Sequence, residues 1–150
     1  QGNIIKNLAA QNLENFFLVY TKKPEKTTGE IVQQVRNLKE DYRQPRISKI
    51  GKTAYEMADA LVNNDAEKIK ECINTAQKNL SELGVSTQEI DEICNSVKSI
   101  GGAGKLSGAG GGGVVLCYHN DKLKLMKTIS DLGFSVKETI LGDEGVRVER

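Results

Sequence analysis

One glycine-rich stretch holds the residues of this 150-residue chain that are best suited to binding chemistry. It consists of one hydroxyl residue and five small residues: Ser107, Gly108, Ala109, Gly110, Gly111 and Gly112. Ordering a glycine costs about 0.5–1 kcal/mol more than ordering an alanine, so such a run is expected only where bare backbone is needed. Consecutive N–H groups without side chains form a nest for phosphate or carboxylate. We therefore predict a substrate- or phosphate-binding loop here.

The run has other interpretations, and the hydroxyl of Ser107 has two alternative roles within it. A flexible linker is disfavoured because Leu106 precedes the run and an apolar stretch, residues 114–118, follows it. The glycines could instead only pack a strand against a helix, and the loop would then bind no anion. The Ser107 hydroxyl could donate to a ligand or bond back to its own loop.

Two common phosphate-binding motifs do not fit. A dinucleotide fingerprint places its glycines after a strand and before a helix, whereas this run follows a helical segment and opens a strand. A Walker A loop needs a first glycine, four residues, and then Gly-Lys followed by serine or threonine. Leu106 follows Gly104-Lys105, and Arg46 stands where Gly51-Lys52-Thr53 would need its first glycine.

The elements that must position this loop are mostly helical. Apolar residues at helical spacing predict helices within residues 28–41, 47–62, 65–84, 86–100 and 120–133. Short apolar or alternating runs predict strands at 16–20, 114–118, 134–140 and 146–148. Few short strands separated by helices indicate an α+β fold, with helices on one face of a small, mainly antiparallel sheet.

Two capping boxes are predicted at helix starts. Thr27 with Glu30 would open the first helix, and Ser86 with Glu89 would open the fourth.

Composition limits the class of protein. The composition, 38% hydrophobic and 27% charged residues, is typical of one globular domain. A net charge of +1 does not indicate binding to nucleic acid or to an anionic membrane. No run is long enough to span a membrane, and no signal peptide opens the chain. The three cysteines, Cys72, Cys94 and Cys117, are predicted to be buried free thiols in a reducing cytoplasm. A start at Gln1 suggests a fragment.

Catalytic and metal-binding residues are not predicted. His119 is the only histidine, so neither a histidine metal cluster nor a triad is available. The carboxylate pairs Asp91 with Glu92 and Asp143 with Glu144 are expected on solvated faces. Lys105 is likewise expected to be a solvated charge.

The segment from Lys105 to Gly113, Lys-Leu-Ser-Gly-Ala-Gly-Gly-Gly-Gly, resembles the third, C-terminal signature of the GHMP small-molecule kinases, named for galactokinase, homoserine, mevalonate and phosphomevalonate kinases. Residues 79–86 and 90–94 are similar to the helix–turn–helix that precedes this loop in mevalonate kinases. The resemblance runs from about Phe16 to the end but covers only the C-terminal half of such an enzyme. It implies a lead-in segment at 1–15 and a C-terminal domain at 16–150, with the N-terminal ATP-binding domain outside this chain.

The resemblance implies a ferredoxin-like C-terminal domain and a function. That function is ATP-dependent phosphorylation of mevalonate to 5-phosphomevalonate, in cytoplasmic isoprenoid biosynthesis. ATP and magnesium would be bound mainly by the N-terminal kinase domain, which would be this chain's partner, and the fragment alone would be inactive. Apolar surface exposed by the missing half makes a homodimer possible.

Within that family a threonine at the position of Thr27 lies near the substrate. The alternative is a purely structural role, in which Thr27 only caps its helix. Members often carry a basic residue where this chain has Glu25, which questions a substrate-carboxylate contact there. Alternatives are another GHMP kinase, such as a phosphomevalonate or homoserine kinase, or a non-catalytic anion-binding domain or subunit.

Overall fold

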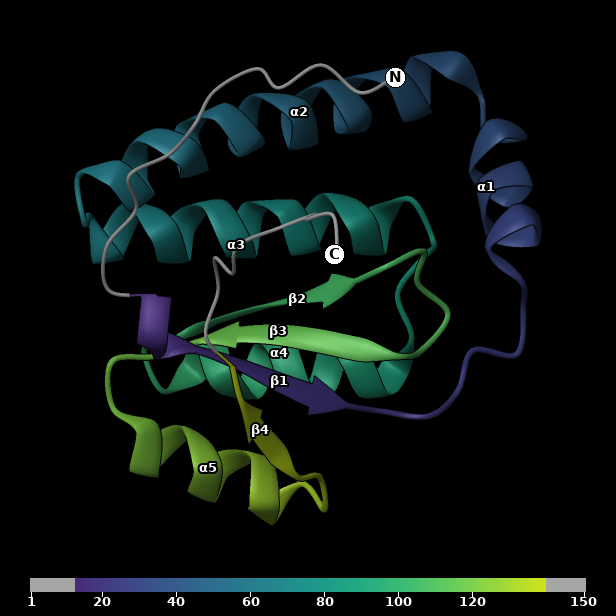
Figure 1. The fold of residues 1–150 in the computed structure, drawn as a ribbon. Coiled ribbons are helices and arrows are strands. Elements are labelled where there is room, and N and C mark those ends of the chain that lie inside the picture. Colours follow the sequence, from purple (N-terminus) through teal and green to yellow (C-terminus); the bar gives the residue numbers. More distant parts are fainter. Residues whose placement is uncertain (1–12, 140–150) are drawn as a thin grey trace, which may run out of the picture.

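A four-stranded antiparallel sheet forms the centre of the domain (Figure 1). The computed structural model describes residues 13–139. Its strands are β1 (Phe16–Tyr20), β2 (Ala103–Ser107), β3 (Val114–Tyr118) and β4 (Val136–Glu138), in the order β2-β3-β1-β4. Leu18 pairs with Leu116 in the centre, and Leu106 pairs with Val115 next to the edge. The α+β prediction is confirmed.

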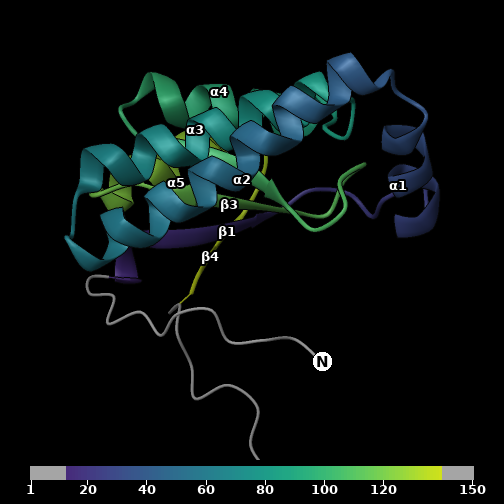
Figure 2. The same cartoon turned by 90° about the horizontal axis from the view of Figure 1, so that it is seen from above.

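Five α-helices surround this sheet after a short 3-10 turn at Leu13–Asn15. They are α1 (Thr28–Arg36), α2 (Glu40–Val62), α3 (Ala66–Glu82), α4 (Gln88–Ser99) and α5 (Lys122–Asp131). α4 and α5 pack on one face of the sheet, and α1 lies beyond its end (Figure 2). α3 packs along β2, the strand at the sheet edge, and α2 packs on α3.

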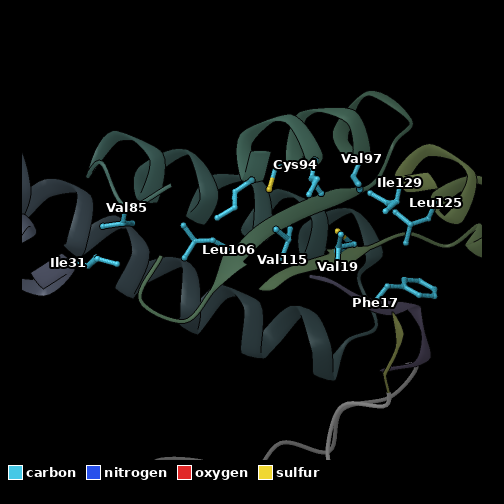
Figure 3. Close-up of a cluster of buried hydrophobic side chains, with 13 residues drawn as sticks. Phe17, Val19, Ile31, Val85, Cys94, Val97, Leu106, Val115, Leu125 and Ile129 are labelled. Carbon is cyan, nitrogen blue, oxygen red and sulfur yellow. The ribbon is translucent and has the colours of Figure 1, made fainter. Parts of the chain in front are cut away.

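The main core fills the space between the sheet, α4 and α5. Alternate residues of each strand point into it, as the two-residue period of a strand requires. It contains Phe17, Val19, Leu106, Val115 and Cys117 from the strands, and Ile90, Ile93, Cys94, Val97, Leu125 and Ile129 from the helices. Burying each large aliphatic side chain stabilises the fold by about 1.5–3 kcal/mol. The cluster extends from Leu125 and Ile129 to Ile31 and Val85 (Figure 3).

A second core joins the opposite strand residues to α2 and α3. Phe16 and Tyr118 meet edge to face, with ring centroids 4.9 Å apart. Around them lie Ala60, Ile69, Ile73 and Ala103. This cluster holds the helix pair against the end of the sheet.

The predicted helix 28–41 is wrong as a single element. α1 ends at Arg36, where Asn37 caps it, and α2 begins at Glu40. The Arg43 side chain donates to the Arg36 carbonyl and links the two helices across the break. The start of α2 is mostly exposed, so its first turns carry no apolar stripe that could have announced it.

Two strand predictions also need correction. Residues 103–107, expected as part of a loop, form β2. Its composition hid it, because Ala, Gly and Lys have low strand propensity. Of the predicted strand 134–140, the structure describes residues 134–139, and Val136–Glu138 is the strand among them. The predicted strand 146–148 and the pair Asp143 with Glu144 lie outside the described residues.

Candidate functional site

The glycine-rich loop connects β2 to β3, two neighbouring antiparallel strands. Five of its glycines have positive φ, namely 101° at Gly108, 101° at Gly110, 73° at Gly111, 132° at Gly112 and 95° at Gly113. An L-residue pays about 1–2 kcal/mol in such left-handed conformations. The loop therefore needs glycine for its backbone path, independently of any ligand.

The loop is packed against two other backbone segments. Gly111 N–H donates to the Val85 carbonyl and Gly113 N–H donates to the Lys22 carbonyl, each at 2.8 Å. A Cβ on Gly110 would lie 2.1 Å from the Val85 oxygen, and one on Gly112 would lie 2.7 Å from the Lys22 oxygen. Close packing of backbone against backbone thus accounts for these two glycines, and it holds the loop in place.

Several N–H groups of the loop stay available. The N–H groups of Gly108, Ala109, Gly110 and Gly112 donate to no acceptor within residues 13–139, whereas that of Gly111 is already occupied. Space is open where a Cβ of Gly108 would stand. The Ser107 side chain is exposed at the end of β2, and no hydrogen bond back to its loop is formed by this hydroxyl in the described structure. The loop therefore has four backbone N–H groups without an acceptor in the described structure, two of them on residues that are not buried, Gly108 and Ala109, and two on the buried Gly110 and Gly112. Ser107 adds one hydroxyl.

Ala109 and Gly111 face two different cavities. Ala109 packs against the main core and borders an apolar cavity of about 400 Å³ between α1, α2 and the end of α3. Gly111 borders a more polar cavity of about 220 Å³ with Lys22, Glu25 and Lys26. Ile31 and Val85 line both cavities and stand between them.

Thr27 caps α1, as predicted. Its Oγ1 accepts from the Glu30 N–H at 3.3 Å, and its own N–H and hydroxyl donate to the Glu30 carboxylate at 2.7 and 2.8 Å. These bonds hold the pKa of Glu30 below its usual value. Ile31, one turn after Thr27, reaches the loop, since a Cβ on Gly111 would lie 3.0 Å from Ile31 Cδ1. α1 is therefore in contact with the loop, while Thr27 itself is fully explained as a cap.

The polar cavity has a rim of mixed charge. Lys22 Nζ lies 3.0 Å from the Glu89 carboxylate and 3.9 Å from that of Glu25. The hydrogen bond to Glu89 raises the pKa of Lys22. Lys26 donates to the Gln34 side chain at 2.9 Å. Glu25 thus brings negative charge to a cavity where the family resemblance leads one to expect a basic residue.

Two predictions about charged residues are wrong. Asp91 is half-buried, and its carboxylate accepts from Gln77 Nε2 at 3.0 Å and from Ser86 Oγ at 2.8 Å. Ser86 therefore does not cap α4; Thr87 does, accepting from Ile90 N–H at 3.3 Å. Lys105 is half-buried and donates to the Leu106 carbonyl at 2.7 Å, and burial lowers its pKa.

The buried Gln77 escaped the sequence reasoning. It lies at helical spacing among the apolar residues of α3, next to the buried Ala76 and four residues after the buried Ile73. A polar residue on such a face was the available signal. Because a buried amide needs hydrogen-bond partners, that position indicates a built polar contact.

The three cysteines and the histidine are buried structural residues. Cys72, Cys94 and Cys117 are buried free thiols, as predicted, and burial raises the pKa of Cys117 to about 12. His119 is buried between the Ile100 carbonyl and the Asp121 N–H. In the described part of the chain, no three His, Cys, Asp or Glu side chains are grouped as they would be around a metal ion. Nor is any helix there long and apolar enough to cross a bilayer.

Comparison with known proteins supports a kinase family. Residues 57–127 match the sequence model of the family described as GHMP kinases C terminal. The mevalonate kinase of Schizosaccharomyces pombe is 36% identical in an alignment over 142 residues that covers 85% of this chain and 35% of that protein. The mevalonate kinase of Thermococcus gammatolerans is 29% identical over 133 residues, covering 82% of this chain and 40% of that protein. The chain thus spans well under half of these relatives.

Solved structures agree on the fold. The Methanococcus jannaschii mevalonate kinase superposes with a TM-score of 0.74 at 27% identity, over 87% of this chain and 41% of that one. Streptococcus pneumoniae phosphomevalonate kinase, at 24% identity, shares the fold with a TM-score of 0.70, over 83% of this chain and 39% of that one. The chain therefore carries the C-terminal domain of the GHMP kinases, and the relatives it matches over most of its length are mevalonate kinases.

Proposed function

We propose that this chain is the substrate-positioning C-terminal half of a mevalonate kinase. The enzyme would transfer the γ-phosphoryl group of ATP to the primary hydroxyl of mevalonate and form 5-phosphomevalonate in isoprenoid biosynthesis, in the cytoplasm. The observation that carries the proposal is the loop between β2 and β3, with backbone donors that have no acceptor among residues 13–139 and glycines held by close packing. Similarity to mevalonate kinases supplies the reaction class.

In this proposal the loop acts by position and electrostatics. Phosphoryl transfer depends mainly on holding the reactants in line and stabilising charge on the transferring group. Donors that are already fixed stabilise that charge without reorganising during the reaction. The N–H groups of Gly108, Ala109 and Gly110 would face the phosphoryl group as it meets the acceptor, and the Ser107 hydroxyl would donate beside them. Gly111 and Gly112 would contribute by fixing the loop, and Thr27 by anchoring α1 at the acceptor side.

The nucleotide and its metal ion would be held mainly outside this chain. The described residues contain no carboxylate cluster suited to Mg²⁺. Bound magnesium would neutralise phosphate charge in the complete enzyme. We propose that residues 1–15 lead in from an upstream ATP-binding domain and that residues 16–150 form the C-terminal domain. The 150-residue chain alone would then be inactive, and no catalytic residue is assigned in it.

Two other functions are kept as candidates. A different GHMP kinase, acting on phosphomevalonate or a homoserine-like acceptor, would have the same fold, which phosphomevalonate kinase shares, and Glu25 at the polar cavity would favour an acceptor with an amino group over an anionic one. A non-catalytic anion-binding domain or subunit would also use the open donors of the loop.

A coupled ATP-consumption assay separates these candidates. It would be run with mevalonate, phosphomevalonate, homoserine and galactose, on the 150-residue chain and on the natural polypeptide extended upstream. We expect turnover of mevalonate only by the extended polypeptide. Turnover by the short chain would contradict the division of roles, turnover of another acceptor would select another GHMP kinase, and no turnover by either would favour the binding domain.

We also propose that the isolated domain self-associates. Apolar side chains remain exposed on α2 and α5, with Tyr55 exposed at 68% and Leu123 at 78%. Sedimentation velocity at rising concentration should show a dimer. A single monomer species at high concentration would contradict this.

A further inference from the structure

The backbone N–H and C=O of Leu106, just before the end of β2, are held by side chains on the outer side of the strand. β2 is the terminal strand of the described sheet, so no other strand within residues 13–139 receives its outward groups. Leu106 N–H donates to Gln77 Oε1 at 2.8 Å, and Lys105 Nζ donates to the Leu106 carbonyl at 2.7 Å. Two side chains thus take the place of a neighbouring strand at the residue that precedes Ser107.

Gln77 is itself fixed from the other side. Its residue is only 6% exposed, and its Nε2 lies 3.0 Å from both Ser86 Oγ and Asp91 Oδ1. Ser86 in turn donates to the same Asp91 oxygen. One buried amide therefore connects α3 and β2 to the turn that leads into α4.

That turn also holds the middle of the loop. Val85, directly before Ser86, accepts the Gly111 N–H through its carbonyl at 2.8 Å. The entrance of the loop at Leu106 and its contact at Gly111 are consequently both tied to the neighbourhood of Gln77. The free N–H groups of Gly108 to Gly110 lie between these two fixed points.

We propose that Gln77 and Lys105 are positioning residues, which hold the backbone N–H and C=O of Leu106 and thereby set where the loop presents its free N–H groups. Neither side chain needs to touch a ligand for this role. The bearing on substrate binding rests on the proposed kinase function, whereas the hold on the loop does not.

Amide hydrogen exchange on the natural polypeptide tests the hold directly. Gln77→Met keeps the side-chain length and removes both hydrogen-bonding groups, and Lys105→Met removes the ammonium alone. The matched control is Lys78→Met, at an exposed neighbouring position on α3. We expect exchange of the hydrogen-bonded amides of Leu106 and Gly111 to quicken at least tenfold in Gln77→Met and severalfold in Lys105→Met, with α5 unchanged and the control like the wild type. Unchanged exchange in the loop, or equal acceleration in α5, would overturn the proposal.

Steady-state kinetics on the same proteins test the consequence for the substrate. We expect Gln77→Met to raise the KM for mevalonate about fivefold to tenfold while kcat changes less than twofold, and Lys78→Met to leave both unchanged. A normal KM in a variant with a quickened loop would overturn the positioning role. Absence of turnover by the unsubstituted polypeptide would count against the proposed function instead, and the exchange experiment would still decide whether the two side chains hold the loop. If Gln77→Met does not fold, Lys105→Met carries both measurements.

Discussion

Gly108 and Gly110 provide a matched pair for testing how the loop is built. Both have a φ of 101°, so replacement by alanine places the new side chain on the same unfavourable backbone. They differ in their surroundings. A Cβ on Gly108 meets open space, whereas a Cβ on Gly110 would stand 2.1 Å from the Val85 carbonyl oxygen.

The structure gives an expected magnitude for each variant. Backbone strain of about 1–2 kcal/mol applies to both Gly108→Ala and Gly110→Ala. Real Cβ atoms essentially never approach closer than 3.0 Å, so Gly110→Ala must separate the loop from Val85 by about 1 Å. That movement breaks the Gly111 to Val85 hydrogen bond, which adds about 1 kcal/mol, and leaves a carbonyl without its partner at about 1–3 kcal/mol. Gly110→Ala should therefore lose about 3–6 kcal/mol of unfolding free energy, against about 1–2 kcal/mol for Gly108→Ala.

Urea unfolding followed by circular dichroism at a fixed temperature measures both losses. We expect the unfolding free energy of Gly110→Ala to be at least 1.5 kcal/mol below that of Gly108→Ala, on the order of the broken contact, with the same denaturant dependence. Equal losses in the two variants would refute the reasoning, because they would show that the loop does not rest on Val85. In the complete enzyme, Gly108→Ala would further report whether the open side of the loop is used by a ligand.

Three further predictions concern single groups. Burial holds the pKa of Lys105 below its usual value. At pH values just below that usual value the unfolded chain therefore binds more protons than the folded chain, so the unfolding free energy of the wild type should rise with pH there. Urea unfolding of Lys105→Met at several pH values should not show this rise. The three buried thiols, Cys72, Cys94 and Cys117, should react with dithionitrobenzoate only after unfolding, and rapid labelling of the native protein would contradict their burial. Ala109→Leu should place its larger side chain in the apolar cavity of about 400 Å³, so the melting temperature should stay near the wild type, while displacement of the Ala109 N–H should raise the KM for mevalonate in the complete enzyme; an unchanged KM would remove Ala109 from the site.

Local features of the fold were predictable from sequence. Thr27, Asp65 and Asp121 all cap helices, because each side chain needs to reach only the N–H three residues further on. Gly84 and Gly133 end helices with positive φ, as glycines at that position commonly do. The loop itself was found because so many consecutive glycines have few explanations.

Features that depend on distant partners were not predictable in the same way. β2 was missed because its pairing with β3 compensates for weak strand formers, and sequence periodicity reports no pairing. Asp91 was taken as solvated since its partners, Gln77 and Ser86, come from other segments. In α5, helical spacing alone does not tell which leucine is buried, since Leu123 is exposed while Leu125 is buried. Contacts between segments decided each of these outcomes.

The side chains that hold Leu106 also bear on how the domain avoids aggregation. A terminal strand with unpaired N–H and C=O groups invites a strand from another molecule. On β2 the groups of Leu106 are taken by Gln77 and Lys105, and Gly104 lies close to Cys94 in α4, where an added Cβ would be 3.2 Å from the Cys94 Cα. At the opposite edge, β4 has three residues, two of them the charged Lys137 and Glu138. Both edges of the described sheet are therefore disfavoured for strand addition, so self-association of this domain should proceed through helices and leave the sheet unextended.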